Sequence, residues 1–220
     1  MTEVLILAEG QTEETFLRDV LRPYLHDFGV TISVTLLKTK ILANAPDFKG
    51  GASHWGQIER DLNNLLKRKK QAVVTTMLDF YGLPKDTPGI SSMPTSDCYA
   101  SVSHVEAEME NSIGNRLLKV YLALHEFEAF IFVNPEIVLE LYPDKKSVVE
   151  KLKKIAAEHE SPEHINLGKE TAPSKRIRKI LPSYRKVGDG VLLVNELGID
   201  QIAENCKHFH AWVDWMKSQA

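Results

Sequence analysis

The stretch VLILAEGQTEETF, residues 4–16, decides the fold class, because an apolar run ends abruptly in a group of acids. Residues 3–8 have the continuous apolar character of a strand that is buried on both faces. Glu9 and Gly10 follow at once, and we expect Thr12 to cap the helix that comes next. Strand, turn and helix in this order form the first unit of an α/β fold.

Composition is that of a soluble globular protein. The chain has 220 residues, enough for one domain or for one core with an appendage, and 43% of them are hydrophobic. No apolar run approaches the roughly 20 residues of a membrane-spanning helix, and the start lacks the pattern of a signal peptide. We therefore expect a cytoplasmic protein without membrane association, with Cys98 and Cys206 as reduced thiols. A net charge of -3 argues against coating nucleic acid by bulk attraction, but permits a local basic patch.

Three further segments have the pattern of strands, at residues 31–37, 72–78 and 119–124. Helices are expected at about residues 53–69, 101–112, 147–160, 174–181, 191–197 and 209–217. Alternating strands and helices predict an α/β fold with a Rossmann-like parallel sheet of about four strands and helices on both faces. We expect the first and third strands to be neighbours.

The chain after the last strand contains only helical signals. We expect residues 1–134 to form the α/β core and residues 135–220 to form a C-terminal helical extension packed on it. The two parts should make a single structural unit, because no linker rich in glycine or serine separates them.

Acids follow three of the four strands. In an open parallel sheet the carboxyl ends of the strands share one edge, so Glu9, Asp79 and Glu126 should converge. Carboxylates at close range repel one another and raise one another's pKa, and a hard divalent cation such as Mg²⁺ relieves this repulsion. Glu13 stands four residues after Glu9 and faces the same cation if it lies in the first helical turn. The sequence therefore predicts a metal site.

Each of these acids also has a simpler interpretation. A helix N-terminus stabilises acids by its dipole, so the first stretch alone would favour a capped helix, and Asp79 at an equivalent strand end favours the metal site. We expect only one of Glu126 and Glu128 to face the site. His125 is a candidate general base or ligand-orienting residue, although a histidine at a strand end is more often merely hydrogen-bonded.

Basic segments are weighed in the same way. Residues 67–70 fit a solvated helix terminus. Lys175, Arg176 and Arg178 follow a proline at a predicted helix start, where N–H groups and cations can bind a phosphate or can form a solvated face. Residues 206–210, CKHFH, lack a fourth zinc ligand, so we interpret them as a helix start with a buried Cys206 and predict no zinc there.

Several segments resemble a bacterial family of uncharacterised Toprim-clan proteins often encoded beside ABC-type ATPases, related to the nuclease domains of overcoming-lysogenization-defect proteins. The similar segments are ILAEGQTEETF (6–16), TTMLDFYGLPKDTPG (75–89), LALHEFEAFIF (122–132), TAPSKRI (171–177) and CKHFHAW (206–212). The resemblance implies a Toprim fold that binds Mg²⁺ or Mn²⁺.

In that resemblance Glu9 matches the Toprim glutamate, Glu13 the second acid of an ExxxE variant, and Asp79 the first aspartate of a DxD motif. Tyr81 takes the place of the second aspartate, so Glu126 or Glu128 would have to supply the missing charge. The metal-ligand candidates are thus Glu9, Glu13, Asp79, Glu126 and Glu128.

We expect a Mg²⁺-dependent Toprim-type nuclease, or nuclease-like effector, that acts on nucleic acid with a partner ATPase, in phage defence. The catalytic candidates are Glu9, Asp79, Glu126, His125 and Lys175, and the phosphate-binding candidates are Lys175, Arg176 and Arg178. Two alternatives stay open: a degenerate, non-catalytic Toprim domain that binds an ATPase or nucleic acid, and a small-molecule phosphohydrolase or phosphotransferase. A homodimer is also left open.

Overall fold

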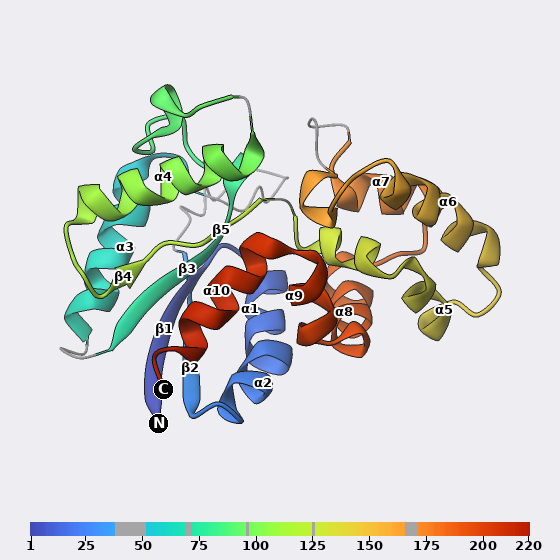
Figure 1. Ribbon diagram of the computed structural model, residues 1–220, viewed down its shortest axis with the longest axis horizontal. Coiled ribbons are helices and arrows are strands. Elements are labelled where there is room, and N and C mark those ends of the chain that lie inside the picture. Colours follow the sequence, from blue (N-terminus) through green and yellow to red (C-terminus); the bar gives the residue numbers. More distant parts are fainter. Residues whose placement is uncertain (38–51, 69–71, 96, 125, 166–170) are drawn as a thin grey trace, which may run out of the picture.

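The computed structural model (Figure 1) describes residues 1–37, 52–68, 72–95, 97–124, 126–165 and 171–220. Its sheet consists of parallel strands in the order β2-β1-β3-β4, with β5 pairing β3 beyond β4. The strands are β1 (Thr2–Ala8), β2 (Val30–Leu36), β3 (Val73–Asp79), β4 (Leu118–Lys119) and β5 (Leu122–Ala123). The predicted α/β fold with a parallel sheet is confirmed.

The pairing of β1 with β3 brings their carboxyl ends together. The register aligns Leu7 with Thr76 and Ala8 with Met77, and the Glu9 N–H donates to the Met77 carbonyl at 3.2 Å. The predicted adjacency of the first and third strands is therefore confirmed, and Glu9 leaves the sheet beside Asp79.

Side chains of β1 alternate between two cores. Val4, Ile6 and Ala8 belong to one apolar cluster, and Leu5 and Leu7 belong to the other. Residues of α1 (Gln11–Phe16), α8 (Val191–Leu197), α9 (Ile199–Asn205) and α10 (Lys207–Lys217) fill the first cluster, and those of α3 (Trp55–Arg68) and α4 (Cys98–Ile113) fill the second. Helices thus cover both faces of the sheet, as Figure 1 shows.

The first helix begins earlier than the sequence indicates. Gly10 is the N-cap residue, and the Glu14 N–H donates to its carbonyl at 3.0 Å, so the helix starts at Gln11. Thr12 is buried inside the first turn and caps nothing, which corrects the expected role of its hydroxyl. After α1 the chain continues through a π-helical turn (Leu17–Leu21) into α2 (Arg22–His26).

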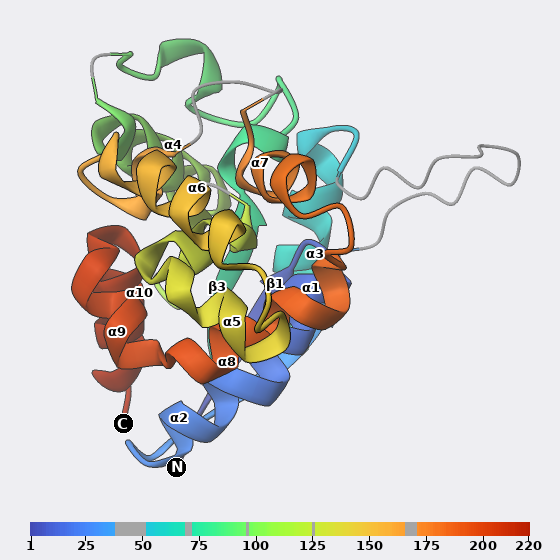
Figure 2. The ribbon, with the colours of Figure 1, turned by 90° about the vertical axis from the view of Figure 1, so that its right-hand side faces the viewer.

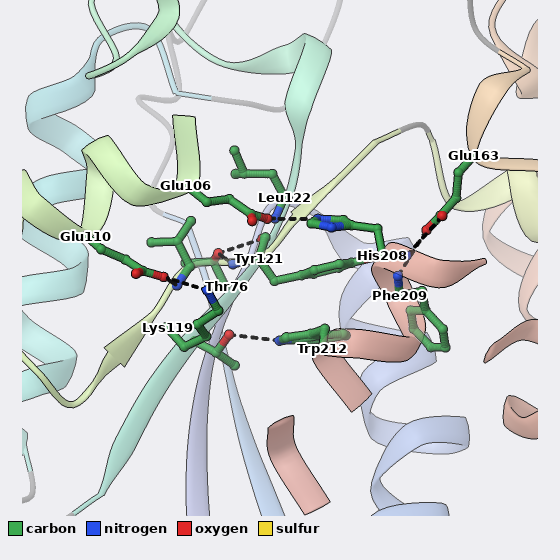
Figure 3. A network of polar contacts seen from close by, with 12 residues as sticks. Thr76, Glu106, Glu110, Lys119, Tyr121, Leu122, Glu163, His208, Phe209 and Trp212 are labelled. Atoms are coloured by element: carbon green, nitrogen blue, oxygen red, sulfur yellow. Dashed lines mark hydrogen bonds and ion pairs between the residues drawn. The ribbon is translucent and has the colours of Figure 1, made fainter. Parts of the chain in front are cut away.

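The predicted strand at residues 119–124 is split into β4 and β5. At the break, the Thr76 hydroxyl donates to the Tyr121 carbonyl at 2.7 Å and accepts from the Tyr121 N–H at 2.9 Å. A side chain therefore replaces the strand-to-strand backbone bonds at this point (Figure 3). The Tyr121 ring stacks on Trp212 of α10, with centroids 4.1 Å apart and planes at 7°.

The chain after residue 134 is helical within the described ranges. It contains η5 (Pro135–Ile137), α5 (Val138–Leu141), α6 (Lys146–Ala157), η6 (Pro162–His164), α7 (Pro173–Ile180), η7 (Lys186–Gly190), α8, α9 and α10. Helices α5 and α9 were not predicted. The helices α5, α6 and α7 form the side of the molecule that faces the viewer in Figure 2.

Apolar residues of these helices share one core with β1. The division of the chain at residue 134 stays a prediction. Among the described residues, the helices lack the combination of length and apolar character needed to cross a lipid bilayer.

We expect Trp212→Phe to destabilise the fold by about 2 kcal/mol, because the buried Thr75 hydroxyl loses its hydrogen bond from the indole N–H at 2.9 Å. Urea unfolding followed by circular dichroism measures this loss. Trp215→Phe, at a partly buried position of the same helix, is the matched control and should cost less than half as much. Equal losses in the two variants would contradict the importance of this bond.

Candidate functional site

Two carboxylates meet where β1 and β3 end. The Asp79 backbone N–H donates to Glu9 Oε2 at 2.8 Å, and the Tyr81 N–H donates to Asp79 Oδ1 at 3.0 Å. A Cβ at Gly82 would lie 3.3 Å from Glu9 Oε1 and 3.4 Å from the Asp79 Cβ, so the glycine leaves room for both acids. Backbone geometry therefore fixes the pair at the sheet edge.

Burial makes both acids weaker than usual. Desolvation raises the pKa of Glu9 to about 7; the hydrogen bond from Asp79 opposes this, and the charges of Asp79 and Glu13 add to it. Desolvation also raises the pKa of Asp79 to about 6, the hydrogen bond from Tyr81 opposes this, and the charge of Glu126 adds to it. In the metal-free protein the pair is thus partly protonated near neutral pH.

A lysine from η7 lies close to two further acids, Glu126 and Glu128. Lys186 Nζ lies 3.2 Å from Glu128 Oε2 and 4.0 Å from Glu126 Oε1. The Glu128 side chain is fully buried, and its oxygens accept no well-aligned hydrogen bond from the described residues. The pKa of Glu128 is raised to about 7, because the effect of burial is larger than the opposing effect of the Lys186 charge. Burial alone would lower the pKa of Lys186, but Glu128 and Glu126 raise it above its usual value.

Glu126 and Glu128 both approach the ammonium group of Lys186, and the charge of Glu126 also raises the pKa of Asp79. The expectation that only one of the two glutamates faces the metal site stays a prediction. The segment is not extended: η4 (Phe127–Val133) is a 3₁₀ helix, and this turn directs Glu126 and Glu128 toward Lys186. His125 lies outside the described residues.

Glu13 also belongs to this cluster. It stands in the first turn of α1, and its charge raises the pKa of Glu9 and of Asp79. A Cβ at Gly10 would lie 3.1 Å from Glu13 Oε2, so the carboxylate folds back over the turn. We define the carboxylate cluster as Glu9, Glu13, Asp79, Glu126 and Glu128.

The predicted phosphate-binding segment lies next to the cluster. Helix α7 begins at Pro173, and the Ser174 N–H at its start donates to Glu126 Oε2 at 2.9 Å. The Arg176 Nε donates to the Thr171 carbonyl at 2.7 Å, which ties this side chain to its own helix start. Lys175 and Arg178 are solvent-exposed on the same helix. Contact between α7 and the cluster runs through Glu126.

The predicted interpretation of residues 206–210 as a helix start is confirmed. Cys206 is fully buried and is the N-cap residue of α10. His208 Nε2 lies 2.9 Å from Glu106 Oε1, and the same oxygen accepts the Leu122 N–H at 2.8 Å (Figure 3). This network fastens α10 to the end of the sheet.

Lys186 is a described member of the site region that the sequence analysis did not find. It follows Arg185 in SYRKVGDG, residues 183–190, where no motif marks it. Only the folded chain brings it to the acids, since it is far from them along the sequence.

The cluster has the donor chemistry of a magnesium site but an open geometry. All of its donors are carboxylate oxygens, which Mg²⁺ prefers. Within the described residues, no three carboxylates of the cluster have ligand atoms that all lie within 4.8 Å of one another; a group that meets this criterion is Asp97, Cys98 and His164, at another place in the fold. A cation at the cluster would therefore be held by one or two carboxylates together with water or phosphate oxygens, as is usual for Mg²⁺.

Comparison with models of protein families identifies the family of this chain. The chain belongs to the family described as "Domain of unknown function (DUF4276)", whose model matches residues 8–217. No curated protein matches it.

A solved structure, the C-terminal region of the Xanthomonas campestris pv. campestris OLD protein, is similar over 98% of this chain and 97% of that chain. The two are 13% identical, with a TM-score of 0.37, a similarity too low to support an argument about function.

We expect Glu9→Gln to stabilise the metal-free protein at pH 8 and to change little at pH 5. The pKa of Glu9 rises from 4.5 to about 7 on folding, so the folded state holds its proton more tightly and loses stability as pH rises through this window. Glutamine keeps an acceptor for the Asp79 N–H without the charge. The gain at pH 8 should be on the order of 2 kcal/mol.

Urea unfolding at both pH values in the presence of a chelator measures this difference. Glu14→Gln, in the same stretch, is the control for a change of net charge. A Glu9→Gln gain that is equal at pH 5 and pH 8 would contradict the raised pKa.

We expect Lys186→Met to destabilise the protein by about 3 kcal/mol at pH 8, because it leaves the buried Glu128 without a counter-charge. Adding Glu128→Gln to that variant should recover most of the loss, since the unpaired charge is then gone. A double-mutant cycle from urea unfolding gives the coupling energy. Additive losses in the double variant would show that the pair does not interact.

Proposed function

We propose that this protein is a Toprim-type, Mg²⁺- or Mn²⁺-dependent nuclease, which cleaves phosphodiester bonds of nucleic acid at the carboxylate cluster. The observation that carries the proposal is the pair of Glu9 and Asp79 on adjacent parallel strands, with pKa values raised to about 7 and about 6. Such a pair is costly without a cation, and sites that shift pKa values in this way are often functional.

Glu9 and Asp79 are the residues that would hold the cation, with Glu13 close enough to orient its water ligands. A bound divalent cation would activate water and stabilise the leaving oxygen. Because binding requires the ionised carboxylates, it would release the protons that the raised pKa values retain near neutral pH.

Glu126 and Lys186 would set the charge around the reacting phosphate. Lys186 offsets the charges of Glu128 and Glu126, so the local excess of negative charge that a nucleic-acid phosphate meets is reduced. Exposed cations of α7, at Lys175 and Arg178, would bind neighbouring phosphates, since the Ser174 contact holds the start of this helix against Glu126.

The partner and the biological role are inferred from the sequence resemblance alone. We propose an ABC-type ATPase as partner, a role in phage defence and a cytoplasmic location. The oligomeric state is left open, with a homodimer as one candidate.

A second candidate function is a nuclease-like domain that binds nucleic acid or an ATPase without cutting. Tyr81 favours it, because this residue occupies the place of the second aspartate in the resemblance and its side chain is 53% exposed. Its backbone N–H still supports Asp79. The position therefore contributes a hydrogen bond to the pair but no carboxylate.

We expect the purified chain to cleave DNA or RNA in the presence of Mg²⁺ or Mn²⁺, and not with a chelator. Glu9→Gln and Asp79→Asn should each lower the rate at least about a hundredfold, because each removes a charge that binds the cation. Glu14→Gln is the matched control and should keep the wild-type rate. Gel assays on labelled single- and double-stranded substrates measure these rates.

Cleavage that persists in both variants would contradict the assignment of the site. Binding of nucleic acid without cleavage, under every metal condition, would favour the second candidate instead. Release of phosphate from a small phosphomonoester, with no effect on DNA or RNA, would point to a phosphohydrolase.

A further inference from the structure

A second group of ligand-type side chains lies at the N-terminus of α4, apart from the carboxylate cluster. Asp97, Cys98 and His164 each offer one ligand atom, and these atoms lie within 4.8 Å of one another. Asp97 and Cys98 begin α4, whereas His164 ends η6, far along the chain. Oxygen, sulfur and nitrogen donors are thus brought together by the fold.

The neighbours of these three residues hold the two segments together. The Tyr99 hydroxyl, next to Cys98, donates to Glu163 Oε2 at 3.0 Å, next to His164. The rings of Tyr99 and His164 pack edge to face with centroids 5.0 Å apart. The distance between the donor groups is therefore fixed by adjacent contacts.

Glu163 is itself firmly anchored. Its side chain is 5% exposed and accepts the backbone N–H groups of His208 and Phe209, at 3.1 Å and 3.0 Å, at the start of α10 (Figure 3). The contact of η6 with α4 is thus built on the same network that fastens α10 to the sheet. Glu163 thereby holds the segment that carries His164 against the start of α4, which carries Cys98.

Each donor keeps capacity for a metal. Asp97 caps α4 by accepting the Tyr99 and Ala100 N–H groups at 3.4 Å and 3.1 Å, and a carboxylate has further lone pairs. Cys98 is a free, half-buried thiol. His164 Nδ1 is buried and forms no hydrogen bond with the described residues. A buried ring nitrogen without a partner is costly unless something satisfies it.

A cavity of about 310 Å³ adjoins the group. Asp97 and His164 line it together with Glu160 and Glu204. Lys207 also lines the cavity, and its Nζ lies 3.6 Å from the centroid of the Tyr99 ring. The cavity is polar and large enough to hold water molecules beside the donors.

We propose that Asp97, Cys98 and His164 bind a zinc ion, with a water molecule from the cavity as the fourth ligand. Zinc accepts oxygen, sulfur and nitrogen donors in tetrahedral geometry, whereas Mg²⁺ selects oxygen donors. Ligand atoms around such an ion are about 3.3–3.8 Å apart, so small side-chain rotations suffice. The site is independent of the carboxylate cluster and of the proposed nuclease activity.

Cobalt substitution tests this directly, because Co²⁺ in a zinc site reports a thiolate ligand by a charge-transfer band in the near ultraviolet. The full chain, stripped with a chelator, should bind one Co²⁺ with this band and should exchange it for Zn²⁺ but not for Mg²⁺. Cys98→Ser should abolish the band. His164→Gln and Asp97→Asn should weaken Zn²⁺ binding at least about tenfold in calorimetry.

Matched controls separate this site from others. The Asp97→Asn variant retains a side chain that caps the helix, so loss of Zn²⁺ binding in this variant is not explained by loss of α4. Glu14→Gln and His210→Gln, an exposed histidine of α10, should bind Zn²⁺ as the wild type does. Wild-type protein without a thiolate band, or Zn²⁺ affinity unchanged by Cys98→Ser and His164→Gln, would overturn the proposal.

Discussion

The parallel pairing of β1 with β3 is the constraint on which the rest of the molecule depends. It places Glu9 and Asp79 side by side, and the hydrogen bond from the Asp79 N–H to Glu9 Oε2 is made at the point where the ladder ends. Both strands are buried on both faces, so the carboxylates emerge from an apolar layer and are poorly solvated. Their raised pKa values follow from this position. Two ionised acids at this position lower the free energy of unfolding, whereas apolar residues would not. Stability alone therefore does not explain their presence.

The C-terminal helices complete the edge that the strands begin. Lys186 comes from η7, and its pairing with the fully buried Glu128 compensates part of the negative charge. The backbone of α7 meets the same cluster through the bond from Ser174 to Glu126. These contacts join the acids at the ends of the strands to the helices after residue 134, and the two regions share one apolar core. Charge at the site and packing of the helices are thus linked.

Much of the fold and the acids of the candidate site could be predicted from the sequence, for physical reasons. Continuous apolar runs that end in acids predict buried parallel strands, and the shared edge then predicts the meeting of Glu9 and Asp79. The break at Tyr121 could not be predicted, since it depends on a hydroxyl of Thr76 from a neighbouring strand. Lys186 was missed because no local motif marks it, and its partner Glu128 is distant along the chain. Helix α9 was missed because its seven residues carry three buried apolar side chains, whereas the predicted helix α8, of the same length, carries four.

The central claim is that the edge formed by Glu9 and Asp79 binds a divalent cation. Anomalous diffraction from crystals grown with Mn²⁺ locates such an ion directly and separates it from one bound by Asp97, Cys98 and His164. The account predicts a Mn²⁺ peak in contact with a carboxylate oxygen of Glu9 or Asp79 in the wild type, and no peak there in Glu9→Gln crystals. A wild-type map with no ion at this edge, at Mn²⁺ concentrations that saturate calorimetric binding, would contradict it.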